Sequence, residues 1–166
     1  FALLQQCSGC HGVLEQSQMD QVPNLAGQLK PYLVSQLEMF RSGERVDSTM
    51  NVMNEMASQL TDEHIDFFGA HFSLSSPKPS TVESVEVSAS IVEIAKDTCF
   101  SCHSGQSDAV GPLIHGQKPQ YILNQLEAFK SGKRTGEIMP SIMEDLEVEI
   151  FADLAKYIGA QAVPVE

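Results

Sequence analysis

The chain is poor in basic residues. Its 166 residues include 10 Lys and Arg against 22 Asp and Glu, which gives a formal net charge of −12. Binding to nucleic acid needs a basic surface, so this balance argues against a nucleic acid partner. An acidic surface instead favours solubility and docking to a basic patch on a partner protein.

Long hydrophobic runs are missing as well. No apolar stretch approaches the roughly 20 residues that span a bilayer, so we do not expect the chain itself to cross a membrane. Nothing at its start resembles a signal peptide, and we expect that a leader was removed or excluded before Phe1. The length allows one domain or two small domains of about 80 residues each.

Spare cysteines are absent too. All four cysteines belong to two copies of Cys-x-x-Cys-His, at residues 7–11 and 99–103, which leaves no thiol for a disulfide or a separate metal site. The sequence also contains no glycine-rich phosphate loop and no Ser/His/Asp arrangement. We therefore do not expect this chain to be an enzyme by itself.

The repeated motif is typical of covalent haem attachment. Its two cysteines form thioethers with the haem vinyl groups, and the histidine that follows ligates the iron. The alternative is one zinc site built from both cysteine pairs, which would leave the two histidines as coincidences. Because the whole five-residue unit is duplicated, we predict two covalently attached haem c groups. The residues concerned are Cys7, Cys10, His11, Cys99, Cys102 and His103.

The two motifs lie in two similar halves. One stretch repeats at a constant offset of 89 residues, while the offset is 92 at the cysteine motifs and 86 at the last helix. We expect two tandem domains, residues 1–75 and 88–166, joined by a linker over residues 76–87 that begins rich in Pro and Ser. The matching positions include Gly27, Gln28, Tyr32, Gln36, Phe40, Gly43 and Arg45, which correspond to Gly116, Gln117, Tyr121, Gln125, Phe129, Gly132 and Arg134.

The periodicity of both halves is helical, because apolar residues recur at three- and four-residue steps. The prediction is therefore an all-α chain of two small helical bundles, each around a covalent haem. The segment before the first cysteine motif, residues 1–6, is barely one helical turn, and the alternating stretch from Val82 to Val87 lies in the connector. Helices are predicted to begin near Pro31 and Pro119 and to cover residues 61–72, 91–98 and 147–159.

The second axial ligand of each iron has no fixed spacing from the motif. Methionines at helical steps are more often core filler than ligands. Met53, however, lies seven residues before Leu60 at the last helix of its half, and Met139 stands in the same register in the second half. Pro140 would stiffen a loop that presents the Met139 sulfur. The candidates are Met50, Met53, Met56, Met139 and Met143, with His115 as an outsider.

The remaining histidines and two repeated arginines have less specific interpretations. His115 has no counterpart in the first half, so we interpret it as partly exposed or hydrogen-bonded rather than ligating. His64 and His71 are expected at the surface of a helix. Arg45 and Arg134 either pair with a haem propionate or are solvated charges at a helix end, and the sequence leaves both interpretations open.

On these residues the chain resembles the dihaem class I cytochromes c of the cytochrome c4 type, over nearly its whole length. The shared features are Cys-x-x-Cys-His, Pro-x-Leu-x-Gly-Gln, a tyrosine-containing helix, a Gly-x-Arg turn, a methionine loop and a closing helix. The resemblance implies two domains about a pseudo-twofold axis with facing haem edges. It also implies Met53 and Met139 as axial methionines, and carbonyls of Pro23 and Pro112 that hold the proximal histidines. The dihaem cytochrome subunit of flavocytochrome c sulfide dehydrogenase is a similar, competing relative.

The expected function is electron transfer in a respiratory chain. His/Met ligation fills both axial positions of each iron and leaves no open site for a substrate. Two alternatives stay open: an electron-accepting subunit of a complex that oxidises sulfur compounds, and a haem sensor or peroxidase if one methionine ligand is absent. Covalent haem attachment takes place outside the bacterial cytoplasm, so we expect a periplasmic protein, soluble or loosely held at the membrane. The resemblance implies a quinol-oxidising complex as donor and a terminal oxidase as acceptor.

Overall fold

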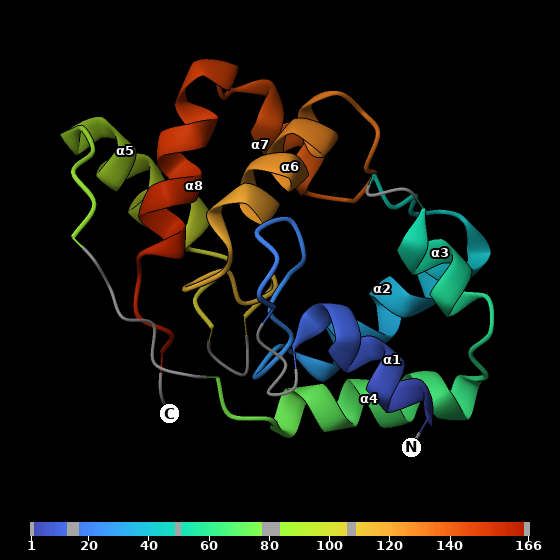
Figure 1. Cartoon of the computed structure of the whole chain (residues 1–166). Coiled ribbons are helices and arrows are strands. Elements are labelled where there is room, and N and C mark those ends of the chain that lie inside the picture. The colour runs from blue at the N-terminus through green and yellow to red at the C-terminus, as the bar shows by residue number, and fades with distance from the viewer. Residues whose placement is uncertain (1, 13–16, 49–50, 78–83, 106–108, 165–166) are drawn as a thin grey trace.

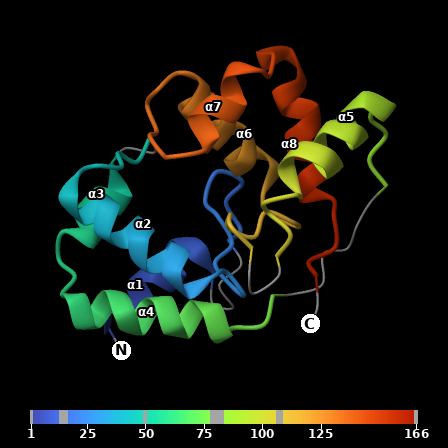
Figure 2. The same cartoon turned by 180° about the vertical axis from the view of Figure 1, so that it is seen from behind.

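The computed structural model describes residues 2–12, 17–48, 51–77, 84–105 and 109–164, and these residues form helices and their connections. Two groups of helices face each other, one from each half of the sequence. A loop of each half, coloured blue in the first and yellow in the second, lies between them (Figure 1). Seen from behind, the same separation holds (Figure 2). The predicted all-α fold is confirmed. Among the described helices, none has the length and apolar character needed to cross a bilayer.

The first group is built around one small core. Its helices α2 and α4 pack against each other, and α3 packs on α2. The buried core residues are Leu33, Leu60, Ile65, Phe68 and Phe72. The helices are α1 (Ala2–His11), α2 (Lys30–Ser42), α3 (Val52–Ala57) and α4 (Asp62–Leu74).

The second group has a larger core of its own. Helix α6 packs on α7 and α8, and α5 packs on α8. The most deeply buried side chains are Ala95, Met143, Phe151, Leu154 and Ala155. The helices are α5 (Ala89–Ile94), which continues into a π-helical turn (Ala95–Cys99), α6 (Pro119–Lys130), α7 (Met139–Glu144) and α8 (Phe151–Gly159), which follows a 3₁₀ turn (Val148–Ile150).

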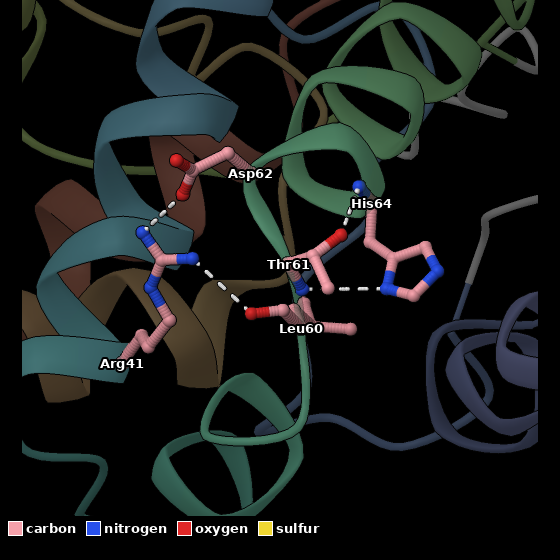
Figure 3. Close-up of polar contacts among 5 residues, drawn as sticks. All are labelled: Arg41, Leu60, Thr61, Asp62 and His64. Atoms are coloured by element: carbon pink, nitrogen blue, oxygen red, sulfur yellow. Dashed lines mark hydrogen bonds and ion pairs between the residues drawn. The ribbon is translucent and has the colours of Figure 1, made fainter.

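Local sequence signals explain where the helices begin and end. Helix α2 starts with Pro31 in its first turn and ends at Gly43, whose φ of 82° favours a residue without a Cβ. Helix α4 has a capping box, in which the Thr61 hydroxyl accepts from the His64 N–H and the Thr61 N–H donates to His64 Nδ1, both at 3.3 Å (Figure 3). Asp62 lies in the first turn, where its negative charge complements the helix dipole.

Equivalent basic residues, Arg41 on α2 and Lys130 on α6, bind the segment that precedes the last helix of their own half. Arg41 donates to the Leu60 carbonyl at 3.1 Å and forms an ion pair with Asp62 at 2.7 Å (Figure 3). In the second half Lys130 donates to the carbonyls of Met143, at 2.8 Å, and Leu146, at 2.9 Å. The Leu60 carbonyl lies just before Thr61, and the Met143 carbonyl also accepts from the Leu146 N–H at 3.3 Å, so the basic side chains supply additional donors in these segments.

Three expectations need correction. Helix α1 is not one turn but runs ten residues, through the whole first cysteine motif to His11. The predicted methionine loops instead begin short helices, α3 and α7, and Pro140 lies in the first turn of α7, where its missing N–H needs no partner. Helix α5 and its π-helical turn together start at Ala89, slightly earlier than predicted.

Candidate haem sites

The first cysteine motif is presented by a single helix. Cys7 and Cys10 lie three residues apart on α1 and therefore share a face, and His11 closes the helix. His11 is buried, and its Nδ1 lies 2.9 Å from the carbonyl oxygen of Pro23. A carbonyl can only accept, so Nδ1 carries the proton and Nε2 keeps its lone pair for a metal.

The second motif repeats this arrangement with a different backbone. His103 follows the π-helical turn that ends at Cys99, and its N–H donates to the Cys99 carbonyl at 3.0 Å. Its Nδ1 lies 2.7 Å from the carbonyl oxygen of Pro112. Gly111 packs against the ring, because a Cβ there would lie 2.6 Å from His103 Nδ1. The proline carbonyls thus hold both histidines, as the resemblance implies.

The protonation state of both histidines suits iron ligation. Burial lowers the pKa of His11 and of His103 below the ordinary value for histidine, and the proline carbonyls oppose that shift. The neutral ring is favoured in both cases, and this is the form that ligates a metal. The chemistry of the donor set therefore fits one haem iron at each motif.

The alternative of one shared zinc site is wrong for the described residues, which include all four cysteines. No group of three or more potential metal ligands of the His, Cys, Asp or Glu type comes together among them. Burial also raises the pKa of the free Cys99 thiol to about 11. Two separate attachment sites remain.

Met53 is linked to Asp47 through its backbone. It is the second residue of α3, and its N–H donates to Asp47 Oδ2 at 3.2 Å. Burial lowers the pKa of His11, and the negative charge of Asp47 opposes that shift to a smaller extent than the Pro23 carbonyl does. The Asn54 side chain fixes this segment, since it accepts from the Asp47 N–H at 2.8 Å and donates to the Arg45 carbonyl at 2.7 Å.

The second-half methionines divide into one core residue and one candidate ligand. Met143 is 1% exposed and belongs to the core, whereas Met139 is partly buried at the start of α7. In the 86-residue register Met56 corresponds to Ile142, which cannot ligate a metal, so only Met53 and Met139 are methionine in both halves. Met50 lies outside the described residues.

The other histidines are structural. The His115 ring stacks on Phe100 with ring centroids 4.2 Å apart, and its Nδ1 has no hydrogen-bond partner in the described part of the chain. It is partly exposed, which is one of the two predicted alternatives. His64 is more than a surface residue because it caps α4, and His71 stacks on Phe67.

Arg45 and Arg134 join the two halves. Arg45 is 7% exposed, so its interpretation as a solvated helix-end charge is wrong. It donates to Tyr121 Oη at 3.2 Å, and Arg134 donates to Tyr32 Oη at 3.0 Å. Burial alone would raise the pKa of Tyr32, but the two guanidinium groups lower it below its ordinary value. The amide oxygens of Gln36 and Gln125, one from each half, accept from both arginines.

Two glutamines cross the same boundary elsewhere, and sequence reasoning missed their role. Gln117 contacts the backbone of Asn24, and Gln28 contacts the backbone of Leu113. Both side chains are buried, with 8% and 6% exposed for Gln117 and Gln28. In the sequence they match at the 89-residue offset and end the Pro-x-Leu-x-Gly-Gln motif, but neither feature indicates a contact with the other half.

Taken together, these features define a class: an all-helical dihaem cytochrome of the c type, with each proximal histidine held by a proline carbonyl. Comparisons with known proteins agree. The family model for cytochrome c matches residues 1–66. Over 167 residues the chain is 30% identical to cytochrome c4 of Pseudomonas aeruginosa, and the match covers 92% of this chain and 82% of that protein.

Two further similarities extend over most of the chain. The structure of cytochrome c4 from Acidithiobacillus ferrooxidans superposes with a TM-score of 0.82 at 25% identity, and the match covers 94% of this chain and 99% of that one. A protein of Stutzerimonas stutzeri named as a thiosulfate dehydrogenase electron acceptor is 28% identical, over 92% of this chain and 79% of its own length.

The chain belongs to the cytochrome c4 family. It is an electron carrier rather than an enzyme, it carries two haem c groups with His/Met ligation, and it exchanges electrons with partner proteins.

Proposed function

We propose that each half binds its haem through the residues singled out by the duplicated sequence. The paired contacts from His11 to Pro23 and from His103 to Pro112 carry this proposal, because they leave Nε2 of each ring available as a ligand. When bound, the haem supplies an iron that gains or loses one electron. The first site is Cys7, Cys10, His11 and Met53, and the second site is Cys99, Cys102, His103 and Met139.

These ligands close both irons to other molecules. With His11 and Met53 holding one haem iron, and His103 and Met139 the other, no ligand position would be left for oxygen, peroxide or carbon monoxide. Asp47 and Asn54 hold the Met53 segment in place through the backbone contacts described above. Electron transfer then needs little rearrangement of the protein, which is the property a carrier requires.

Carbon monoxide binding to the reduced protein tests the ligand assignment. The unaltered protein is expected to bind none, whereas Met53→Ala and Met139→Ala each open one iron and bind about one equivalent. Met56→Leu and Met143→Leu are matched controls and are expected to bind none. Carbon monoxide binding by either control, or by the unaltered protein, would contradict the assignment and favour a sensor or peroxidase.

We also propose that the halves are separate domains over residues 1–75 and 88–166, with residues 76–87 as the linker. Two distinct hydrophobic cores support this division, one within each half. Each haem would add an apolar centre to a domain that is otherwise small for independent stability. Expression of residues 88–166 alone, with haem attached, is expected to give a folded cytochrome.

Arg45 and Arg134 are proposed to neutralise haem propionates where the halves meet. Both guanidinium groups are held by neutral amide and phenol oxygens in the described part of the chain. A buried cation with only neutral partners is poorly compensated, and a carboxylate at the same place would form strong charge-assisted hydrogen bonds.

We propose that the protein acts in the periplasm and associates peripherally with the membrane. A quinol-oxidising complex is the proposed donor and a terminal oxidase the proposed acceptor. The net charge of −12 supports docking to basic patches on such partners. Reduction by the donor complex is expected to slow as ionic strength rises, because salt screens this attraction. A rate that does not change with salt would contradict electrostatic docking.

A second candidate function is the acceptance of electrons from an enzyme that oxidises sulfur compounds. The similarity to the thiosulfate dehydrogenase electron acceptor of Stutzerimonas stutzeri favours it. Stopped-flow reduction by purified thiosulfate dehydrogenase and by a quinol-oxidising complex, at equal concentrations, separates the two candidates. Faster reduction by the dehydrogenase would assign the chain to sulfur oxidation.

A further inference from the structure

Each half extends one glutamine side chain to the backbone of the other half. Gln117 Oε1 accepts from the Asn24 N–H at 2.8 Å, and Gln117 Nε2 donates to the Asn24 carbonyl at 2.9 Å. Gln28 makes the same pair of hydrogen bonds to Leu113, at 2.8 and 2.9 Å. Asn24 and Leu113 match at the 89-residue offset, as the glutamines do, so the two contacts are equivalent in the two halves of the repeat.

Both glutamines are held in place by their own half. The same Oε1 atom of Gln28 accepts from the Leu29 N–H at 3.0 Å, and Oε1 of Gln117 accepts from the Lys118 N–H at 3.0 Å. With both side chains buried, loss of either amide would leave polar backbone groups without partners. The amides are therefore fixed in orientation, with their outer ends directed at the other half.

The peptide group that each glutamine contacts also contacts the opposite proximal histidine. The Pro23 carbonyl accepts from His11, and the Asn24 N–H of the same planar peptide donates to Gln117. The chain of hydrogen bonds thus runs from the His11 ring, through one peptide, to a glutamine of the second half.

The equivalent series of hydrogen bonds runs from the second site into the first half. The Pro112 carbonyl accepts from His103, and the Leu113 N–H of that peptide donates to Gln28. A planar peptide cannot turn its carbonyl without also turning its N–H, so each glutamine fixes the carbonyl that orients the histidine. A donated N–H also polarises the carbonyl and makes it a better acceptor.

We propose that Gln117 is a positioning residue for His11 and that Gln28 is a positioning residue for His103. Each haem site then depends on the other half for the orientation and basicity of its proximal ligand. A better acceptor at Nδ1 makes the imidazole a more basic ligand and favours ferric iron. This inference rests on the proposed assignment of both histidines as iron ligands.

The experiment uses the full protein with both haems. Two variants at equivalent positions, Gln28→Met and Gln117→Met, serve as controls for each other. Methionine keeps the length of the side chain but removes both hydrogen bonds. The ring protons of each axial histidine are observed by NMR of the ferric protein, and the potential of each site is followed through the same resonances.

The expected result is crosswise. Gln117→Met speeds deuterium exchange at His11 Nδ1–H by about tenfold, the factor of one hydrogen bond of ordinary strength, and raises the potential of the first site. Gln28→Met does the same at His103 and the second site. Equal changes at both sites in both variants, changes confined to the half that carries the substitution, or no change would overturn the proposal.

A second pair of variants removes the Nε2 donor of each glutamine but keeps the acceptor oxygen. Gln117→Glu and Gln28→Glu keep an oxygen that accepts from the opposite peptide N–H, and they are expected to lower the potential of the opposite site. An unchanged or raised potential at that site would also overturn the proposal. If the histidine resonances of the unaltered protein showed no shift from the iron, the ligand assignment itself would fail. If the histidine resonances were shifted by the iron but did not change in the glutamine variants, the positioning proposal would fail and the ligand assignment would stand.

Discussion

Arg45 donates a hydrogen bond across the boundary between the two halves to the hydroxyl oxygen of Tyr121, at 3.2 Å. Its guanidinium also stacks over Phe40 of its own half, 4.5 Å from the ring centroid. Arg134 and Tyr32 form the equivalent contact, at 3.0 Å. Because a buried charge needs its hydrogen bonds, these contacts align the halves as well as joining them.

Removal of one hydroxyl tests the strength of this contact. Tyr121→Phe leaves the ring in place but takes one acceptor from Arg45, so we expect the free energy of unfolding to fall by about 1.5–3 kcal/mol, the range for hydrogen bonds to charged groups. Urea unfolding of the holoprotein measures it. Tyr157→Phe is the matched control, because it removes a hydroxyl from α8 outside these cross-half contacts. Equal losses in both variants would contradict a special role for Tyr121.

Gly111→Ala tests the packing of the second proximal histidine. The added Cβ would lie 2.6 Å from the His103 ring, so we expect the ring to shift and the second iron to bind carbon monoxide in the reduced protein. Gly136→Ala is the control, since its Cβ would meet nothing nearer than Phe129 at 3.5 Å. Unchanged spectra in Gly111→Ala would show that the ring is free to move without loss of ligation.

Thr61→Ala tests the cap of α4. It removes the hydroxyl that accepts from the His64 N–H, and we expect a loss of about 1 kcal/mol in the free energy of unfolding, the usual cost of losing an N-cap. Thr61→Ser retains the hydroxyl and is expected to stay near the unaltered value. Denaturant titration followed by circular dichroism compares the two, and a loss of the same size in Thr61→Ser would show that the methyl group matters instead.

Much of the fold follows from short-range signals. Helices α2 and α6 begin at the prolines and end near the glycines that predict them, and Thr61 marks the start of α4. Helix α1 is longer than predicted because the residues of the cysteine motif themselves continue it, although Gly9 has no strong helix preference. Periodicity gives little warning of α3 and α7, since six residues span fewer than two turns.

The parts that the sequence did not predict are long-range. Arg45 lies after a helix in an acidic chain, so burial between two halves has no local signal at that position. Gln28 and Gln117 act on backbone atoms about ninety residues away, and a side-chain contact to backbone does not restrict the residue type of its partner. The duplication marks them, because both halves keep the same polar residue after the same glycine, but it does not identify their partners.

The ferric absorption spectrum tests the central claim most directly. A weak band at the red end of the visible spectrum arises from sulfur bonded to ferric haem iron, and its intensity divided by the haem content reports how many irons carry methionine. We predict two haems for each chain and the band at full intensity for both, with half of it lost in Met53→Ala and half in Met139→Ala. A band of half intensity in the unaltered protein, or one that survives both substitutions together, would contradict the account.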